Sequence, residues 1–274
     1  MRVIDFYDRH PISEAGVLAA VARRRGGALA GPLTADDLFE FDQDHYGGLE
    51  AVAALARRAA VGAGARVLDL CAGLGGPARF LAARLGCRVV AVELNAGRAA
   101  GAARLTRLVG LHHRVGTVRA DAAALPLASA GFDACLSQEA LLHVPDKARV
   151  LRECHRVLRP GGRLAFTDWI ARPRLDEGER RRLETWMAAT GLQDLAGYRR
   201  LLGEAGFAAI EAEDVTGEWR PILASRLERH RALRRETAAR LGAVWEDEYR
   251  QVFGYFVALV EAGKLGGGRF TATR

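Results

Sequence analysis

The segment SQEALLH at residues 137–143 carries an acid and a base at a spacing that suits proton transfer. Glu139 and His143 are four residues apart, so on a helical turn their side chains would share one face. A carboxylate and an imidazole there can take a proton from a group that must be neutral before it reacts. Glu139 and His143 are therefore candidate catalytic residues. The alternative for His143 is a structural histidine that begins a helix and bonds a backbone carbonyl.

A glycine-rich turn, CAGLGG at residues 71–76, indicates a nucleotide site. It follows an apolar segment that contains Asp69, and its glycines let the backbone approach a bound nucleotide closely. Glu93 ends the next apolar segment, where an acidic residue can accept hydrogen bonds from both ribose hydroxyls. Asp121 and Ala122 end a third segment, where a carboxylate and a backbone N–H suit the edge of an adenine.

These residues alone leave two classes of enzyme open. Gly73, Gly75 and Ala78 also satisfy the dinucleotide fingerprint G-x-G-x-x-G/A. These residues therefore fit an NAD-dependent oxidoreductase as well as an enzyme that uses another nucleotide cofactor.

Short apolar segments alternate with helical ones and predict the framework that positions these residues. Strands are expected over 66–71, 87–93, 114–121, 132–138, 162–168 and 207–215, with a seventh within 266–274. Helices are expected near 76–85, 95–109 and 145–158. Such alternation is typical of right-handed βαβ crossovers and of a mostly parallel sheet with helices on both faces.

Two further helical regions flank this α/β unit. Residues 1–65 have a helical pattern, and a helical insertion is expected at about 217–264, before the last strand. Neither region has the character of an independent domain. We expect 1–65 to form a lid and the insertion to complete an acceptor pocket within a unit spanning 66–274.

The composition limits the classes of binding partner and the cellular compartment that we expect for this protein. The formal net charge is +7, and Lys147 and Lys264 are the only lysines, so arginine carries nearly all the positive charge. Mixed with acidic residues, these arginines are typical of solvated faces. No apolar segment reaches the roughly 20 residues that span a bilayer, and no leader is evident. The four cysteines lack metal-ligand spacing. We expect a cytoplasmic protein with no metal site and no membrane partner.

Four motifs in sequence order resemble the class I S-adenosylmethionine-dependent methyltransferases over residues 64–170. They are VLDLCAGLGGPARFLA, VVAVELN, the Asp121-Ala122 turn and VLRPGGRLAFTD. The resemblance implies a Rossmann-like seven-stranded, mostly parallel sheet and S-adenosylmethionine as the cofactor. It implies cofactor contacts from Asp69, Cys71, Ala72, Gly73, Gly75, Glu93, Leu94, Asn95, Asp121, Ala122 and Gln138. Cys71 stands where these families usually have glycine, so we do not expect a glycine-only backbone conformation there.

Within this class, SQEALLH resembles the sarcosine/dimethylglycine and phosphoethanolamine N-methyltransferases, and also sterol and tocopherol C-methyltransferases. The resemblance implies that Gln138 contacts the cofactor and that His143 acts as a base or orients a loop tyrosine. Tyr46 is the nearest candidate for that tyrosine. Glu139 stands where the amine enzymes usually have aspartate. The segment WMAATG at 186–191 lacks the Arg/Tyr pair that grips phosphate in the phosphoethanolamine enzymes, which disfavours a phosphorylated acceptor.

The sequence thus predicts an enzyme that methylates a small molecule, with an amine nitrogen as the favoured acceptor. The alternatives are a C- or O-methyltransferase of a natural-product pathway, a nucleic-acid methyltransferase and a cofactor-binding protein without enzymatic activity. The stretch after the fourth strand argues against nucleic acid, because it lacks the Pro-Pro-aromatic motif that grips a flipped base. No Pro-Cys pair for cytosine C5 chemistry occurs.

Overall fold

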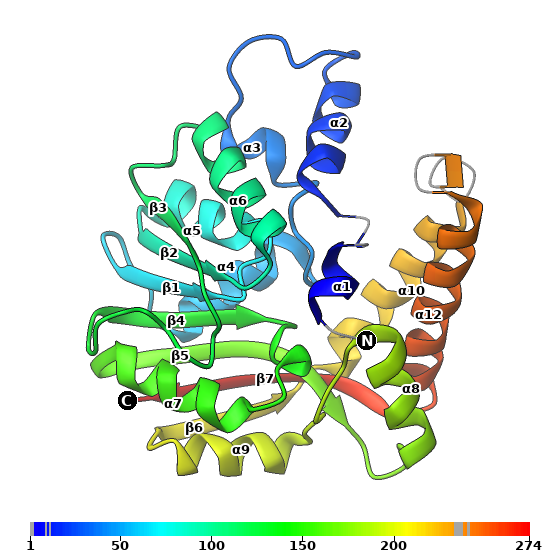
Figure 1. Cartoon of the computed structure of the whole chain (residues 1–274). Helices are drawn as coiled ribbons and strands as arrows, with labels where there is room; N and C mark the ends of the chain where they lie inside the picture. Colours follow the sequence, from blue (N-terminus) through cyan, green and yellow to red (C-terminus); the bar gives the residue numbers. More distant parts are fainter. Residues whose placement is uncertain (1–2, 9, 11, 233–237, 240–241) are drawn as a thin grey trace.

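A seven-stranded sheet forms the centre of the molecule, with strand order β3-β2-β1-β4-β5-β7-β6 (Figure 1). The computed structural model describes residues 3–8, 10, 12–232, 238–239 and 242–274. The strands are β1 (Arg66–Leu70), β2 (Arg88–Glu93), β3 (Val115–Arg119), β4 (Phe132–Gln138), β5 (Leu158–Ala171), β6 (Ala208–Asp214) and β7 (Leu265–Thr273). Only β7 runs antiparallel to its neighbours, β5 and β6. The predicted mostly parallel sheet is confirmed.

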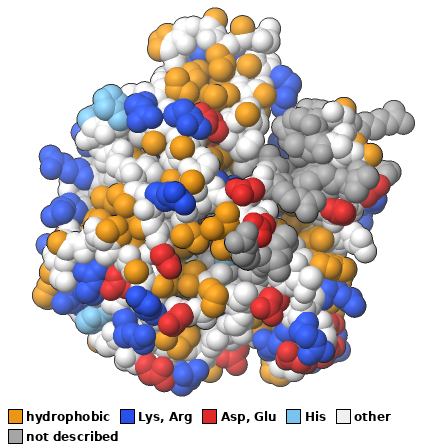
Figure 2. All heavy atoms as spheres, viewed as in Figure 1, with side chains coloured by type: hydrophobic (Ala, Val, Ile, Leu, Met, Phe, Trp, Pro, Cys, Tyr) orange, Lys and Arg blue, Asp and Glu red, His pale blue; other side chains and the backbone are white. Residues whose placement is uncertain are grey.

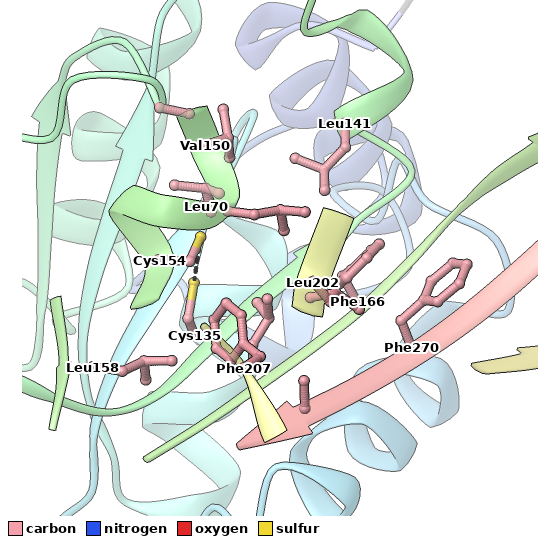
Figure 3. Packing of buried hydrophobic residues seen from close by; sticks show 14 of the residues in the cluster. Leu70, Cys135, Leu141, Val150, Cys154, Leu158, Phe166, Leu202, Phe207 and Phe270 are labelled. Carbon is pink, nitrogen blue, oxygen red and sulfur yellow. Dashed lines mark hydrogen bonds between the residues drawn. The ribbon is translucent and has the colours of Figure 1, made fainter. Parts of the chain in front are cut away.

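Helices cover both faces of the sheet. Helices α4 and α5 pack on one face, and α7 and α9 pack on the other, where their leucine, valine and cysteine side chains meet those of β1, β4 and β5 (Figure 3). The helices are α1 (Val3–Asp8), α2 (Glu14–Arg24), α3 (Ala35–Leu38), α4 (Gly48–Arg58), α5 (Gly76–Leu85), α6 (Ala96–Leu108), the 3₁₀ turn η1 (Leu141–His143), α7 (Lys147–Val157), α8 (Glu177–Met187), α9 (Leu195–Glu204), α10 (Thr216–Ala232) and α12 (Ala243–Glu261).

Local sequence explains where the helices beside the site begin. Gly75, at φ +75°, is the N-cap of α5, and Pro77 lies in the first turn, where its missing N–H costs nothing. Asn95 caps α6 through its side chain, which accepts from the backbone N–H of Arg98. Strand β5 starts earlier than predicted, at Leu158. That residue pairs with Phe132 before a register shift in the ladder, and within the Pro-Gly-Gly segment Gly161 has a φ of +76°.

Helix α1 and the insertion lie at the same end of the sheet (Figure 1). Helices α10 and α12 form the insertion between β6 and β7 and pack together with α8 over the ends of β5 and β7. The expected insertion includes residues 233–237 and 240–241, which lie outside the described residues. Helix α1 lies near α10 and α12, across from α6. These elements form walls beyond the carboxyl ends of the strands.

A buried ion pair fixes the loop at 42–46 to the sheet domain. The guanidinium of Arg79 on α5 donates to Asp42 at 2.8 Å, and both side chains are inaccessible to solvent. Arg79 also donates to the hydroxyl of Thr106 on α6 at 3.2 Å. At Gly76, a Cβ would lie 2.4 Å from the carbonyl oxygen of Asp42, so this close approach requires glycine. The loop therefore has a fixed position against α5.

Many surface arginines form ion pairs with acidic side chains. Pairs such as Arg24 with Glu40 at 2.9 Å and Arg84 with Asp36 at 2.6 Å are at least half exposed. On the face seen in Figure 2, basic and acidic side chains are interspersed. Part of the arginine charge on the surface is thus compensated by nearby carboxylates.

None of the helices in the described part of the chain combines the length and apolar character needed to cross a membrane.

Candidate active site

A cavity of about 460 Å³ lies at the carboxyl ends of β1, β2 and β4. The sheet side supplies the turns that follow these strands. The opposite wall comes from α1, the loop at 42–46, α8, α10 and α12. Most of the predicted site residues meet here: Tyr46, Asp69, Cys71, Ala72, Gly73, Glu93, Leu94, Asn95, Asp121, Gln138, Glu139 and His143.

Asp69 brings an unsatisfied carboxylate oxygen to the cavity. The residue is 4% exposed, and its Oδ2 atom has no hydrogen-bond partner among the described residues. Burial raises the pKa of Asp69 to about 7. A buried oxygen without a donor costs free energy, so this position favours a ligand that brings a donor or a positive charge.

Glu93 joins the glycine turn at 71–76 to the turn at 93–95 that follows β2; these two turns are called the cofactor loops below. Its Oε2 accepts from the N–H of Gly73 at 2.9 Å, and its Oε1 accepts from the N–H of Asn95 at 2.8 Å. Burial raises the pKa of this carboxyl. Gly73 has a φ of +57°, and a Cβ there would lie 2.8 Å from the Arg98 guanidinium. At Gly73 the backbone therefore packs closely against the Arg98 guanidinium.

Two predicted contacts lie outside the cavity wall. Gly75 is the N-cap of α5 and faces the guanidinium of Arg79, so it shapes the turn instead. Ala122 is 6% exposed and packs in the core. Ala123 lines the cavity in its place, and its N–H donates to the Asp121 carboxylate at 2.8 Å. The motif located this turn, but the residue that faces the cavity is one position further along.

Cys71 has a left-handed backbone, with φ +58°. The expectation that a cysteine would avoid the conformation favoured by glycine is therefore wrong. An L-residue can occupy this region at a cost of roughly 1–2 kcal/mol, and such strain persists where the surroundings determine the backbone. Cys71 lines the cavity at the start of the glycine turn.

Glu139 links the loop at 42–46 to strand β5. Its Oε2 accepts from the N–H of Tyr46 at 2.7 Å, and its Oε1 accepts from the hydroxyl of Thr167 at 2.5 Å. Burial raises the pKa of Glu139 to about 7. Its φ of +44° is a strained value for a residue with a side chain. Both carboxylate oxygens are thus engaged within the protein.

The spacing of Glu139 and His143 predicted that they would share a helical face. The structure shows that they do not. The helical turn η1 is a single 3₁₀ turn over Leu141–His143, and Glu139 precedes it. The positive φ of Glu139 turns the chain before η1 begins. Both side chains line the cavity, but they bind different partners.

The surroundings of His143 determine which ring nitrogen carries the proton. Its Nδ1 lies 3.2 Å from the carbonyl oxygen of Ala188, which can only accept, so Nδ1 is the protonated nitrogen. Burial lowers the pKa of His143 to about 4, so the ring is neutral near pH 7. Its Nε2 is then an acceptor, and the hydroxyl of Tyr7 donates to it at 3.0 Å.

The tyrosine beside His143 is Tyr7, not Tyr46. Tyr46 lines the cavity, but its ring packs edge-on against Trp219, with centroids 4.9 Å apart. The guanidinium of Arg226 lies 4.9 Å from the centre of the same ring. Sequence reasoning missed Tyr7 because it lies on a six-residue helix without a motif. The only signal for it was an aromatic pair near the N-terminus.

Helix α1 is held over the cavity by the cofactor loops. The side-chain amide of Asn95 donates to Asp8 at 2.7 Å. The guanidinium of Arg98 donates to the carbonyl of Ile12 at 3.1 Å and to Asp44 at 2.9 Å. It also lies 4.6 Å from the centre of the Tyr7 ring. The same loop segment thus faces the cavity and orients the N-terminal wall.

Gln138 lies at the junction of the two walls. Its side chain is 3.0 Å from Nδ1 of His45, whose Nε2 lies 2.8 Å from the amide oxygen of Gln43. Burial lowers the pKa of His45 to about 4, so this ring is also neutral. The arrangement fixes Gln138 at the cavity wall, where the sequence predicted a cofactor contact.

Comparisons with known proteins agree with this geometry. Residues 68–166 match the family model described as a methyltransferase domain. The chain is 36% identical over 174 residues to the sarcosine/dimethylglycine N-methyltransferase of Halorhodospira halochloris, a match that covers 61% of this chain and 60% of the relative. The chain therefore spans about three fifths of that relative's length.

A second relative is matched over more of its length. The chain is 32% identical over 207 residues to the 27-O-demethylrifamycin SV methyltransferase of Amycolatopsis mediterranei, covering 74% of this chain and 75% of the relative. The fold is also that of a Haemonchus contortus phosphoethanolamine N-methyltransferase, with a TM-score of 0.81 and 21% identity over 100% of this chain and 60% of that one. The chain therefore belongs to the class I S-adenosylmethionine-dependent methyltransferases.

Proposed function

We propose that this chain transfers the methyl group of S-adenosylmethionine to a small molecule, with an amine nitrogen as the acceptor. The observation that carries the proposal is the Tyr7–His143 pair, a hydroxyl bonded to a neutral imidazole in the wall of a cavity that also contains the cofactor loops. That pair provides a path for the proton that an amine loses when it is methylated.

The residues present fit the cofactor. The unpartnered Oδ2 of Asp69 suits an ammonium group, and Gly73 of the glycine turn lines the same cavity. Glu93, at the end of β2, would accept from ribose hydroxyls, and Asp121 would face the adenine. When bound, S-adenosylmethionine supplies a methyl group on a positively charged sulfur.

Side chains of the protein can take up the proton that the acceptor amine loses. Burial raises the pKa of Tyr7 well above its ordinary value, so the phenol alone does not ionise near pH 7. Its oxygen can accept an N–H of the acceptor while its own proton moves to Nε2 of His143. The carbonyl of Ala188 then stabilises the charged ring through Nδ1. The remaining catalytic contribution is positioning and the exclusion of water.

The N-terminal segment fits the role of a lid. Asp8, Ile12 and Asp44 contact Asn95 and Arg98 of the cofactor region, so closing this wall and filling the cofactor site are linked. The division into a lid at 1–65 and a catalytic unit at 66–274 is part of the proposal. A cytoplasmic location and the argument against nucleic acid remain predictions from the sequence.

Methylation of a hydroxyl is the second candidate. It is favoured by the match to the 27-O-demethylrifamycin SV methyltransferase over 75% of that relative's length. The Tyr7–His143 pair can receive a hydroxyl proton by the same path. The class of product separates the two candidates, because one is a methylated amine and the other an ether.

The test is transfer of a labelled methyl group from S-adenosylmethionine to a cell extract that is then separated into small molecules, nucleic acid and protein. We expect label in the small-molecule fraction, and none with Glu93→Ala as the control. Label only in nucleic acid or protein would contradict the proposal.

A further inference from the structure

A buried lysine contacts both of the segments that surround His143. Lys147 begins α7, and the residue is only 3% exposed although it carries an ammonium group. Its Nζ donates to the carbonyl of Val144, directly after η1, at 2.8 Å and to the carbonyl of Thr190, beyond the end of α8, at 2.6 Å. Lys147 is not among the described residues that line the cavity. It therefore acts on the site through the segments that it holds.

These two segments, 141–144 and 188–190, are joined at three points. The N–H of Thr190 donates to the carbonyl of Leu142 at 2.7 Å. The carbonyl of Ala188 accepts from Nδ1 of His143 at 3.2 Å. The ammonium of Lys147 bridges the carbonyls at the far ends of both segments. The bond that determines the protonated nitrogen of His143 thus lies within a joint that Lys147 closes.

The direction of the Ala188 carbonyl depends on this joint. Ala188 is the C-cap of α8, is 1% exposed and has a left-handed backbone with φ +51°. An alanine does not favour that conformation, so the contacts around it must maintain it. The hydrogen bond from Lys147 to Thr190, two residues further along, is a charged one, and such bonds are stronger than bonds between neutral groups.

The charge of Lys147 has a carboxylate counterpart inside the protein. Asp168 on β5 is inaccessible to solvent, and the hydroxyl of Tyr198 on α9 donates to it. Burial lowers the pKa of Lys147 to about 8, and the Asp168 carboxylate acts to raise it, so the ammonium form prevails near pH 7. Burial raises the pKa of Asp168 to about 6, and the charge of Lys147 acts to lower it. Each group thus stabilises the charged form of the other.

We propose that Lys147 is a positioning residue for methyl transfer: it holds the Ala188 carbonyl against Nδ1 of His143 and so keeps Nε2 as the acceptor for the Tyr7 hydroxyl. Without the ammonium, the carbonyls of Val144 and Thr190 lose their common donor. The segment at 188–190 is then free to move away from the imidazole. This inference rests on the proposed function and adds to it the group that determines the tautomer of His143.

The first experiment measures the tautomer of His143 in the full chain. The histidine rings are labelled with ¹⁵N, and the signals of His143 are identified by their loss in His143→Ala. Near pH 7 we expect the wild type to carry the proton on Nδ1 and none on Nε2. In Lys147→Met the two tautomers should exchange, so the chemical shifts of the two ring nitrogens should move toward each other.

Two further variants accompany this measurement. Lys264→Met is the matched control, because it removes the other lysine of the chain, which pairs with Glu179 on α8 at 2.5 Å. It should keep the chemical shifts of the wild type. Lys147→Gln is tested in parallel in case the methionine variant does not fold, since its shorter side chain stays polar but carries no charge. An unchanged tautomer in the folded Lys147 variant, or a wild-type His143 protonated on Nε2, overturns the inference.

The second experiment separates this inference from the proposed function. Methyl-labelled S-adenosylmethionine and the small-molecule fraction of a cell extract are the substrates. We expect Lys147→Met to lower turnover at least about tenfold, with changes of less than about threefold in the KM for S-adenosylmethionine and the Kd for S-adenosylhomocysteine. Lys264→Met should retain the turnover of the wild type. Wild-type turnover in Lys147→Met, or an equal loss of cofactor affinity, overturns the inference while the proposed function stands. No labelled small molecule with the wild type overturns the proposed function, and the tautomer measurement still tests the joint.

Discussion

Tyr7 on α1 and His143 at the end of η1 lie 136 positions apart in the chain, and the tyrosine hydroxyl donates to Nε2 of the histidine at 3.0 Å. The contact joins the N-terminal wall to the edge of the sheet. The carbonyl of Ala188 fixes the histidine from the other side, at 3.2 Å from Nδ1. The pair is thus complete only when α1 lies over the cavity.

Tyr7→Phe and His143→Ala should each lower turnover by roughly 10²–10⁴-fold, the usual contribution of a positioned proton acceptor. Affinity for S-adenosylhomocysteine should change less than threefold, because neither residue belongs to the cofactor loops. Steady-state kinetics and calorimetry measure the two effects. Tyr46→Phe is the matched control and should retain most of the turnover. Unchanged turnover in His143→Ala would give that residue a structural role.

Gly73→Ala should weaken cofactor binding at least tenfold. The new Cβ would lie 2.8 Å from the Arg98 guanidinium, and φ is +57° at this position. Gly62→Ala is the control, because a Cβ there meets nothing within 4 Å. Calorimetric titration with S-adenosylhomocysteine compares the two variants. Equal affinity in both would show that the glycine turn does not shape the cofactor site.

Arg79→Met should lower the free energy of unfolding by about 3–5 kcal/mol, because it leaves Asp42 as an unpaired buried charge. Adding Asp42→Leu should recover much of that loss. Arg84→Met breaks an exposed pair with Asp36 and should cost less than about 1 kcal/mol. Denaturant titration measures the free energy of unfolding of all three variants. A small effect of Arg79→Met alone would mean that Asp42 is not charged in the folded protein.

The buried histidines should make stability depend on pH. Burial lowers the pKa of His45 to about 4, below the value of about 6.5 for an unfolded chain. The unfolded state therefore binds more protons between these values, and the contribution of His45 is present above pH 6.5 and lost as the pH falls toward 4. The raised pKa values of Asp69 and Glu139 act in the opposite direction, so a variant is needed to isolate the effect.

The variant is His45→Gln, which cannot take up the proton. Its free energy of unfolding relative to that of the wild type should rise by about 2 kcal/mol between pH 7.5 and pH 5. Denaturant titration at the two pH values measures this difference. A constant difference would show that His45 titrates with an ordinary pKa in the folded protein.

Much of the fold was predictable because its signals are local. The alternation of apolar and helical segments located all seven strands, although β5 begins at Leu158, before its predicted start at 162. The glycine turn and Glu93 were predictable because a nucleotide site requires these residue types at this spacing.

The acceptor side was less predictable because its contacts cross the chain. Tyr7 reaches His143 from an N-terminal helix without a motif, and no local pattern reports that contact. Because Glu139 has a positive φ, it does not lie on the helical face that the spacing predicted. A backbone angle of this kind is determined by the tertiary surroundings of the residue and not by its type. Cys71 likewise occupies a left-handed conformation that its residue type does not favour.

The most direct measurement is a calorimetric titration of the protein and of its Glu93→Ala variant with S-adenosylhomocysteine and, separately, with NADH. We predict one site per chain for S-adenosylhomocysteine, lost in Glu93→Ala, and no binding of NADH. Binding of NADH without binding of S-adenosylhomocysteine would contradict the account and favour a dinucleotide-dependent enzyme.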